Sequence, residues 1–322
     1  MHKIKHPHER NFLVVKSNDL IQKSRSMMTL SMQKTFAYIC SLIKPDVVTL
    51  ANPPPDPYEL TFDIKEYCRI CGINITSGGH ALNYVKSNLK SLADSSFFIE
   101  LDERNEVLGR WLDDVRIDKK SHQVTVTIGK YLTPYLLNLN ERFTAYELKA
   151  ILCMKSAYSI RLYEVIKSYQ NFGSFTMSTD EIRKLIFTKG PACDNCHRTE
   201  SCFHCDEYKN IYKDYTDLRR RVLDKAMHDI WKYTEMNVRY HPIKTGYSVI
   251  AVEFEIETKR EFLQLVIQET IDTELDKKKL PIDIKEPSYG RPIHTTSGFK
   301  STQQILGISR RTDSDTFKPP GE

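Results

Sequence analysis

The sequence predicts an α+β fold in which one unit, two helices followed by a β-hairpin, occurs twice along the chain. Three observations support this prediction. Helical patterns at 62–71 and 80–93 precede two strand-like segments, 107–117 and 123–128. The same order of patterns returns after residue 178. The segments FDIKEYCRI and MSTDEIRKLI also share one pattern of polar and apolar residues. Helix, turn, helix and hairpin is the order of a winged helix, so we predict two tandem winged-helix domains.

The composition divides the chain into folded and unfolded parts. The first residues are basic, and the last part of the chain is rich in proline, glycine, serine and threonine, which disfavour a packed core. We expect a flexible basic N-terminal arm at 1–11, winged-helix domains at 12–140 and 141–257, an insertion at 188–206 within the second domain, one further helix at 258–280 and a disordered C-terminal tail at 281–322.

Charge and hydropathy narrow the class of protein. The 322 residues carry 47 Lys and Arg against 42 Asp and Glu, so the net charge of +5 does not by itself identify a partner. No apolar run approaches the roughly 18 residues that cross a membrane. The N-terminal sequence MHKIKHPHERN has no apolar core of a secretion signal. We therefore expect a cytoplasmic protein without a membrane partner, whose eight cysteines stay reduced or bind metal.

The first predicted domain opens with NFLVVKSNDLI at 11–21, which reads as a strand or turn running into a helix. A helix capped by Ser31 follows, because apolar residues recur there at helical spacing. These apolar residues are Phe36, Ile39, Cys40 and Ile43. The helix at 62–71 should end at Gly72, since glycine adopts the left-handed conformation that terminates helices.

The helix predicted at 80–93 has two distinct faces. Its apolar face would point toward the core through Leu82, Val85, Leu89 and Leu92. Another face carries Asn83, Lys86 and Lys90 at positions i, i+3 and i+7. This second face is either a DNA contact or an ordinary solvated helix surface. We predict DNA contact, because the helix occupies the second position of a helix–turn–helix unit.

The second predicted domain repeats the first. We expect helices at 144–154 and 157–169. Ser178 and Glu181 have the spacing of a capping box, which predicts a helix from Thr179 to Phe187.

The stretch YTDLRRRVLDKAMHDIWKYT at 215–234 predicts a five-turn helix with one apolar and one basic face. The apolar stripe consists of Leu218, Val222, Ala226 and Ile230, widened by Leu223, Met227 and Trp231. The basic face carries Arg221, Lys225, His228 and Lys232, with Arg219 and Arg220 near the helix start. A hairpin should follow, with strands at 236–243 and 247–256 and a turn that includes Lys244. We predict that these basic residues contact DNA, against the alternative of a solvated amphipathic helix.

Four cysteines in the predicted insertion have the spacing of a metal site. Cys193 and Cys196 form one CxxC pair, and Cys202 and Cys205 form a second. Four thiolates suit a tetrahedral structural zinc, so we predict zinc here; the alternatives are an iron–sulfur cluster, redox-active thiols and a chance spacing of the cysteines. Cys68 and Cys71 also form a CxxC pair, but the apolar periodicity around them favours ordinary core cysteines.

Several segments together resemble one known family. They are VVKSNDLI at 14–21, LSMQKTFAYICSLI at 30–43, VRIDKKSHQVTVTIGKYLTPYLLNL at 115–139, AYSIRLYEVI at 157–166, DLRRRVLDKAMHDI at 217–230 and GYSVIAVEFEI at 246–256. In this order and spacing they resemble the iteron-type replication initiator (Rep) proteins of bacterial plasmids. The resemblance covers about residues 11 to 257. The paired cysteines of the insertion are not part of that family pattern.

The resemblance implies a function and partners. It implies that two winged helices bind a repeated sequence, the iteron, in double-stranded origin DNA. It further implies that monomers initiate replication, whereas homodimers joined through the first winged helix repress their own promoter. A host replicative helicase or host initiator proteins would be recruited in the bacterial cytoplasm. The second winged helix would be the stronger reader of bases, which assigns Arg219, Arg220, Arg221 and Lys225 to the DNA.

Three functions follow from these observations. The first is an initiator that opens the origin of a plasmid or phage-like element, and the second is a winged-helix repressor without initiator activity. The third is a DNA nickase, which we disfavour because no tyrosine lies in a recognisable catalytic setting. The chain also lacks a GxxxxGK[ST] motif for ATP hydrolysis, so we do not expect an enzyme.

Overall fold

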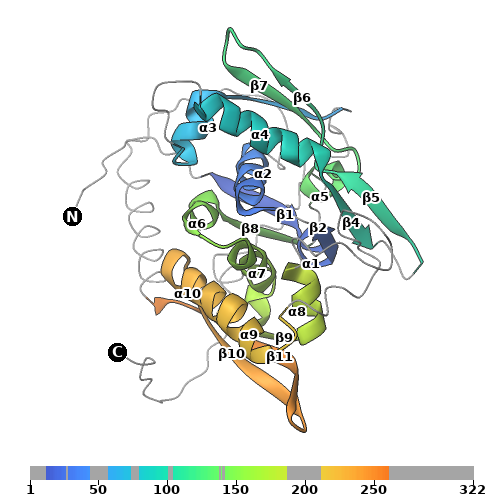
Figure 1. Cartoon of the computed structure of the whole chain (residues 1–322), viewed down its shortest axis with the longest axis vertical. Helices are drawn as coiled ribbons and strands as arrows, with labels where there is room; N and C mark the ends of the chain where they lie inside the picture. The colour runs from blue at the N-terminus through green and yellow to red at the C-terminus, as the bar shows by residue number, and fades with distance from the viewer. Residues whose placement is uncertain are drawn as a thin grey trace, which may run out of the picture.

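The fold is that of a computed structural model, which describes residues 12–26, 28–43, 57–73, 80–100, 104–137, 139, 142–186 and 212–260. Figure 1 shows two halves, the first in the upper part of the view and the second in the lower part. The first half contains β1 (Leu13–Ser17), α1 (Asn18–Lys23), β2 (Ser24–Ser26), α2 (Leu30–Leu42), β3 (Glu59–Asp63), α3 (Ile64–Ile70), α4 (His80–Asp94), β4 (Ser96–Glu100), β5 (Glu106–Arg110), β6 (Leu112–Ile117), β7 (Gln123–Ile128) and α5 (Thr133–Leu137).

The second half repeats the same plan with fewer additions. It contains β8 (Phe143–Glu147), α6 (Leu148–Cys153), α7 (Ala157–Ser168), the short η2 (Gln170–Phe172), β9 (Ser174–Ser178), α8 (Thr179–Ile186), α9 (Tyr215–Leu218), the π turn η4 (Arg219–Leu223), α10 (Asp224–Tyr233), β10 (Met236–Thr245) and β11 (Ser248–Thr258).

Sheet topology confirms the predicted duplication. The first half has two three-stranded sheets, β2-β4-β5 and β3-β7-β6, and in the latter the strand before the helix pair joins the last strand of the hairpin. In the second half, β9, β11 and β10 repeat this arrangement. All of these pairs are antiparallel. The two halves also meet directly, because β1 pairs antiparallel with β8. The chain therefore folds as two winged helices in tandem.

The core is continuous across the two winged helices. Buried apolar residues from Val14 to Ile256 form a single cluster. In the first half, the ring of Tyr38 meets those of Phe62 and Tyr67 edge to face, at centroid distances of 5.3 Å and 4.9 Å. Such aromatic pairs bury large apolar surfaces, so α2, β3 and α3 are held against one another.

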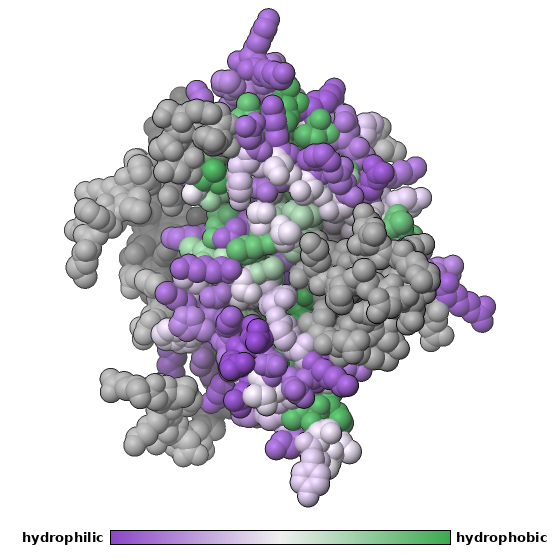
Figure 2. Space-filling view, in the orientation of Figure 1, coloured by the Kyte–Doolittle hydropathy of each residue, from purple (hydrophilic) through white to green (hydrophobic). Residues whose placement is uncertain are grey.

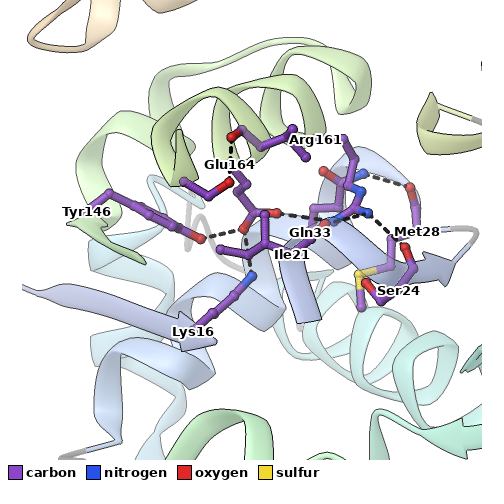
Figure 3. Close-up of polar contacts among 10 residues, drawn as sticks. Lys16, Ile21, Ser24, Met28, Gln33, Tyr146, Arg161 and Glu164 are labelled. Atoms are coloured by element: carbon purple, nitrogen blue, oxygen red, sulfur yellow. Dashed lines mark hydrogen bonds and ion pairs between the residues drawn. The ribbon is translucent and has the colours of Figure 1, made fainter. Parts of the chain in front are cut away.

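A buried ionic network fixes the junction between the two halves (Figure 3). Lys16 on β1 donates to Glu164 on α7 over 2.7 Å, and their side chains are 7% and 5% exposed. Tyr146 on β8 donates to the same carboxylate. Arg161, one turn earlier on α7, lies 3.5 Å from Glu164 and donates to two backbone carbonyls of the first half. The network therefore joins residues that lie far apart in the sequence.

The charges of this network stabilise one another. Burial favours the neutral form of Glu164, but the positive charges of Lys16 and Arg161 outweigh it and hold the pKa of this carboxyl below its ordinary value. Burial raises the pKa of Tyr146, which keeps its hydroxyl protonated as a donor. Since a buried charge without its partner is strongly destabilising, this network favours a single packing of β1 against α7.

Three short strands, β1, β3 and β8, lie directly before helices, and β3 and β8 occupy positions that were predicted as helix. The predicted helix at 62–71 begins only at Ile64, because Phe62 and Asp63 end β3. Asp63 then caps α3 by accepting a hydrogen bond from the backbone N–H of Glu66 over 2.9 Å. The predicted helix at 144–154 is likewise wrong at its start, where β8 runs to Glu147. β1 and α1 match the strand-to-helix prediction at 11–21.

Among the remaining predicted helix ends and turns, two are confirmed and two differ from the structure. The capping box is confirmed: Ser178 accepts from the N–H of Glu181 over 3.1 Å, and Glu181 accepts from the N–H of Ser178 over 2.7 Å. Gly72 has φ +67°, as the predicted helix end requires. The cap at Ser31 is wrong, because α2 begins earlier and Thr29 accepts from the N–H of Met32. The second hairpin turns at residues 246–247, later than predicted.

Several predictions lie outside the described residues. They are the basic arm at 1–11, the cysteine pairs of the insertion, the helix from residue 261 onward and the C-terminal tail. Thr258, the predicted first residue of that helix, is the last residue of β11. In the part of the chain that the structure describes, no helix is long and apolar enough to cross a membrane.

Candidate nucleic-acid interface

The helix predicted at 215–234 is continuous but contains a π turn. The four residues of the apolar stripe, Leu218, Val222, Ala226 and Ile230, are all 0% exposed. A residue spacing of four overshoots one α-helical turn by about 40°. In a straight α-helix, three successive steps of four residues would rotate the later residues of this stripe away from the core. The wider π turn at 219–223 takes in an extra residue and keeps the stripe facing inward.

The second apolar row lies at the edge of the buried face. Leu223 is buried, Met227 is half-buried and Trp231 is 57% exposed. Each of these residues lies about 100° around the helix from the preceding member of the buried stripe, so the drift of a spacing of four carries this row into solvent. The prediction that Trp231 widens the buried stripe is therefore wrong.

The opposite side of this helix presents its basic side chains to solvent. All six basic side chains that were predicted there are exposed: Arg219, Arg220, Arg221, Lys225, His228 and Lys232. Asp217 lies 3.1 Å from Arg220 and 3.5 Å from Arg221. Exposed pairs of this kind contribute little to stability. They orient the guanidinium groups without burying them, so the positive charge stays available to a binding partner. Among the described residues, Lys225 and His228 form no ion pair.

A groove beside the helix adds residues that the sequence did not indicate. Arg221, Lys225 and His228 line one wall, together with the acidic Asp224 and Asp229. The other wall consists of residues just before and at the start of α7, together with Tyr212: Lys155, Ser156, Tyr158 and Tyr212. No sequence signal places Lys155 next to α10, because some 70 residues separate them and only folding brings them together.

Tyr212 supports the side chain of Arg221 in the groove. The guanidinium of Arg221 lies 6.0 Å from the centre of the Tyr212 ring, within cation–π range. The Tyr212 hydroxyl donates to that of Tyr158 over 3.4 Å. Burial, followed by this hydrogen bond, raises the pKa of Tyr212 to about 12, so the ring stays neutral. Arg221 therefore has a fixed aromatic support.

The corresponding helix of the first half carries less charge. Val85, Leu89 and Leu92 of α4 are buried as predicted, whereas Leu82 is half-buried. Among the predicted contacts, Asn83 and Lys90 are exposed and Lys86 is half-buried. Lys90 pairs with Asp94 on the same helix, an exposed pair like those of Arg220 and Arg221 with Asp217. The predicted contacts of α4 include two lysines, against five Lys and Arg side chains on the helix at 215–233, so the basic potential of the two helices is unequal.

The cysteines separate into two groups. Cys193, Cys196, Cys202 and Cys205 lie outside the described residues, and their zinc site stays a prediction. Cys68 is buried at 0% exposure, and burial raises the pKa of Cys71 to about 12. A thiol that stays protonated is a poor metal ligand, which agrees with a core role for this pair. No group of three or more His, Cys, Asp or Glu side chains suits a metal within the described ranges.

Two tandem winged helices, the second with an exposed basic helix, define a DNA-binding protein of the winged-helix class. The chain belongs to the initiator replication protein family: one family model, "Initiator Replication protein, WH1", matches residues 13–167, and a second, "Initiator Rep protein, WH2", matches residues 203–256. The resemblance to plasmid replication initiators is thereby confirmed. The chain is also 30% identical over 144 residues to the PI protein of Escherichia coli, an alignment that spans 42% of each protein.

Proposed function

We propose that the chain initiates replication of a plasmid or phage-like element by binding a repeated sequence in double-stranded origin DNA. The observation that carries this proposal is the helix at 215–233, in which a stripe of four apolar residues is fully buried and six basic side chains are exposed. Membership of the initiator family supports it independently. Electrostatic attraction to phosphates supplies affinity, and arginine side chains in the major groove supply sequence preference.

The two winged helices divide the work in this proposal. The second half reads bases, because arginine can grip guanine with two parallel hydrogen bonds and three arginines follow one another at 219–221. The predicted contact Lys244, exposed in the hairpin, extends this half toward the phosphates. The first half contacts the backbone through Asn83, Lys86 and Lys90. Two linked modules should protect roughly two turns of DNA, since equivalent major-groove faces lie about 10.5 base pairs apart.

The chain acts in this proposal as a binding protein and not as an enzyme. A monomer binds and bends the origin, and a host helicase or host initiator proteins then unwind it. A homodimer in equilibrium with the monomer, joined through the first winged helix, represses the promoter of its own gene. A repressor without initiator activity is the alternative, because it would use the same DNA-binding helix.

A transformation assay tests the proposal. DNA flanking the gene is cloned into a circular vector that has no functional replication origin of its own. The chain is supplied from a second plasmid. We expect transformants with the wild-type chain and at least a tenfold loss with Arg220→Ala and Arg221→Ala combined, since each bidentate contact contributes about 1–3 kcal/mol. The matched control is Arg116→Ala, an exposed arginine on β6 that pairs with Glu59. Repression of the promoter without any transformants would favour the repressor.

A further inference from the structure

The chain leaves the second winged helix at the C-terminal end of α10. β11 ends one residue before Lys259, whose backbone N–H donates to the carbonyl of Glu235 over 2.9 Å. The ammonium group of Lys259 donates to the carbonyl of Trp231, and to that of Thr234 over 2.6 Å. Cations are favoured at this end of a helix, because its last carbonyls carry partial negative charge. The segment that begins at residue 261 is therefore tethered to the end of the basic helix.

An exposed aromatic side chain lies beside this tether. Trp231 is 57% exposed, and the ammonium group of Lys259 lies 5.4 Å from the centre of its ring. On the helix, Trp231 lies about 60° around the axis from His228, at the border between the buried stripe and the basic face. A large apolar side chain at the edge of a charged face suits a partner that is itself both apolar and charged.

The basic face next to Trp231 lacks acidic partners. Figure 2 shows hydrophilic side chains gathered over α9 and α10. Three of the exposed basic side chains there form no ion pair with any described residue: Lys225, His228 and Lys232. Asp224 on the same helix accepts a hydrogen bond from Tyr240 instead. The partner that fits this face therefore has a row of negative charges beside an apolar surface.

The sequence that follows the tether has this composition. Residues 261–276, EFLQLVIQETIDTELD, contain five acidic and no basic side chains. The helix expected there would place Glu269, Asp272 and Asp276 on one side, because successive residues are about 100° apart. Most of the apolar residues fall on the rest of the circumference. The segment therefore combines a negative row with apolar surface.

The segment is also long enough to lie along the basic helix. Its sixteen residues would span about 24 Å as a helix, at about 1.5 Å per residue. The ten positions from Trp231 back to Arg221 need about 15 Å on the same scale. A segment that starts at the tether therefore reaches Lys225 when it runs back along α10.

We propose that residues 261–276 are an acidic strap that folds back along α10. Its apolar side covers Trp231, and its acidic row pairs with the three unpartnered basic side chains, Lys225, His228 and Lys232. A short tether gives an effective concentration in the millimolar range, so weak exposed pairs are enough to hold the strap while DNA still displaces it.

The strap and the phosphates of DNA compete for the same positive charges. In the free chain the strap neutralises part of the basic helix, which lowers the affinity for any duplex. A duplex that makes enough additional contacts displaces the strap. This competition rests on the proposed function, whereas the docking of the strap on Trp231 does not.

Fluorescence quenching tests the docking without DNA. The strap variant is the full-length chain with Glu269→Gln, Asp272→Asn and Asp276→Asn. The chain has two tryptophans and Trp111 is only 3% exposed, so quenching by acrylamide reports mainly on Trp231. Acrylamide is uncharged, so the altered net charge does not bias the comparison. We expect weak quenching in the wild type and strong quenching in the strap variant. High salt should expose Trp231 in the wild type as well, because it screens exposed charges.

Duplex binding is the second measurement, on a duplex that the purified full-length chain selects from a random-sequence pool. We expect the strap variant to bind it about 3- to 150-fold more tightly than the wild type, because three exposed ion pairs are lost from the competing state. The matched control changes the net charge equally in the same part of the chain, through Asp283→Asn, Asp313→Asn and Asp315→Asn. This control should keep Trp231 shielded and bind the duplex as the wild type does.

Equal quenching in the wild type, the strap variant and the control would overturn the strap. Shielding of Trp231 that depends on protein concentration would also overturn it, and would assign this surface to a second copy of the chain. If the strap variant exposes Trp231 but gains no more affinity for the duplex than the control does, competition with DNA is wrong. If the wild-type chain selects no duplex, the proposed function fails, whereas the quenching result still decides the docking.

Discussion

Replacing Glu164 with glutamine removes the negative charge that two buried cations share. The carboxylate accepts from Lys16 over 2.7 Å and lies 3.5 Å from Arg161, in a site where all three side chains are less than a tenth exposed. Breaking a buried ion pair by removing one partner costs about 3–5 kcal/mol. For a folded region of this size, each kcal/mol lowers the melting temperature by about 2–4 °C, so we expect a decrease of about 6–20 °C.

The matched control is Glu257→Gln, which breaks the exposed pair with Arg239. Exposed pairs contribute about 0–1 kcal/mol, so this melting temperature should fall by less than about 4 °C. Thermal unfolding followed by circular dichroism gives both values. If the two variants melt within about 2 °C of each other, the network does not stabilise the junction.

The same substitution has a pH signature. The pKa of Glu164 is lower in the folded chain than the roughly 4.3 of an unfolded glutamate. Stability from the carboxylate is therefore complete above about pH 4.3 and is lost as the pH falls through the folded pKa. The difference between the wild type and Glu164→Gln should be constant from about pH 5 to 8 and shrink in more acidic solution. A difference that grows on acidification would contradict the assigned charge state.

Three further predictions concern metal, catalysis and packing. The purified chain should contain about one zinc, and replacing Cys193 and Cys196 with serine should abolish it; protein made without chelators that contains no zinc would refute the site. Supercoiled plasmid incubated with the chain and magnesium or manganese should stay supercoiled, and relaxation or a covalent tyrosine–DNA adduct would indicate a nickase. Gly129→Ala should lower stability by about 1–3 kcal/mol, because the new Cβ would lie 1.9 Å from the carbonyl oxygen of Arg110; an unchanged urea midpoint would show that the backbone relaxes.

Helical periodicity predicted most helices, but of the four strands that run directly into helices only β1 was indicated by the sequence. β1, β3, β8 and β9 each have five residues and end where a helix begins. At Asp63 the last strand residue also caps the helix, so no turn residue separates the two elements. In the first half this led to a helix predicted two residues too early, at Phe62. A helix-capping residue is compatible with either a strand or a loop before the helix, so the capping signal alone does not reveal which of the two is present.

The π turn and the contacts at the junction between the two halves could not be predicted from the sequence and are visible only in the folded chain. The spacing of four between Leu218 and Val222 was interpreted as ordinary helical periodicity, and the π turn that accommodates it is visible only in the folded chain. Lys16 and Glu164 are separated by 148 positions, so neither residue reveals its partner in the sequence. Helical periodicity predicted that the basic side chains at 219–232 are exposed, whereas their contact with DNA stays a prediction. The opposite wall of the groove, at Lys155, depends on tertiary packing.

The most direct test of DNA reading by the second winged helix compares two alanine variants. Binding of Arg221→Ala and Lys86→Ala is measured at several salt concentrations, on the selected duplex and on a scrambled one. We expect Arg221→Ala to lose about 5- to 150-fold in preference for the selected duplex, the value of one bidentate base contact. Lys86→Ala should weaken both complexes equally and reduce the salt slope by about one, as for a phosphate contact. Equal losses on both duplexes for both variants, or no loss for either, would contradict the account.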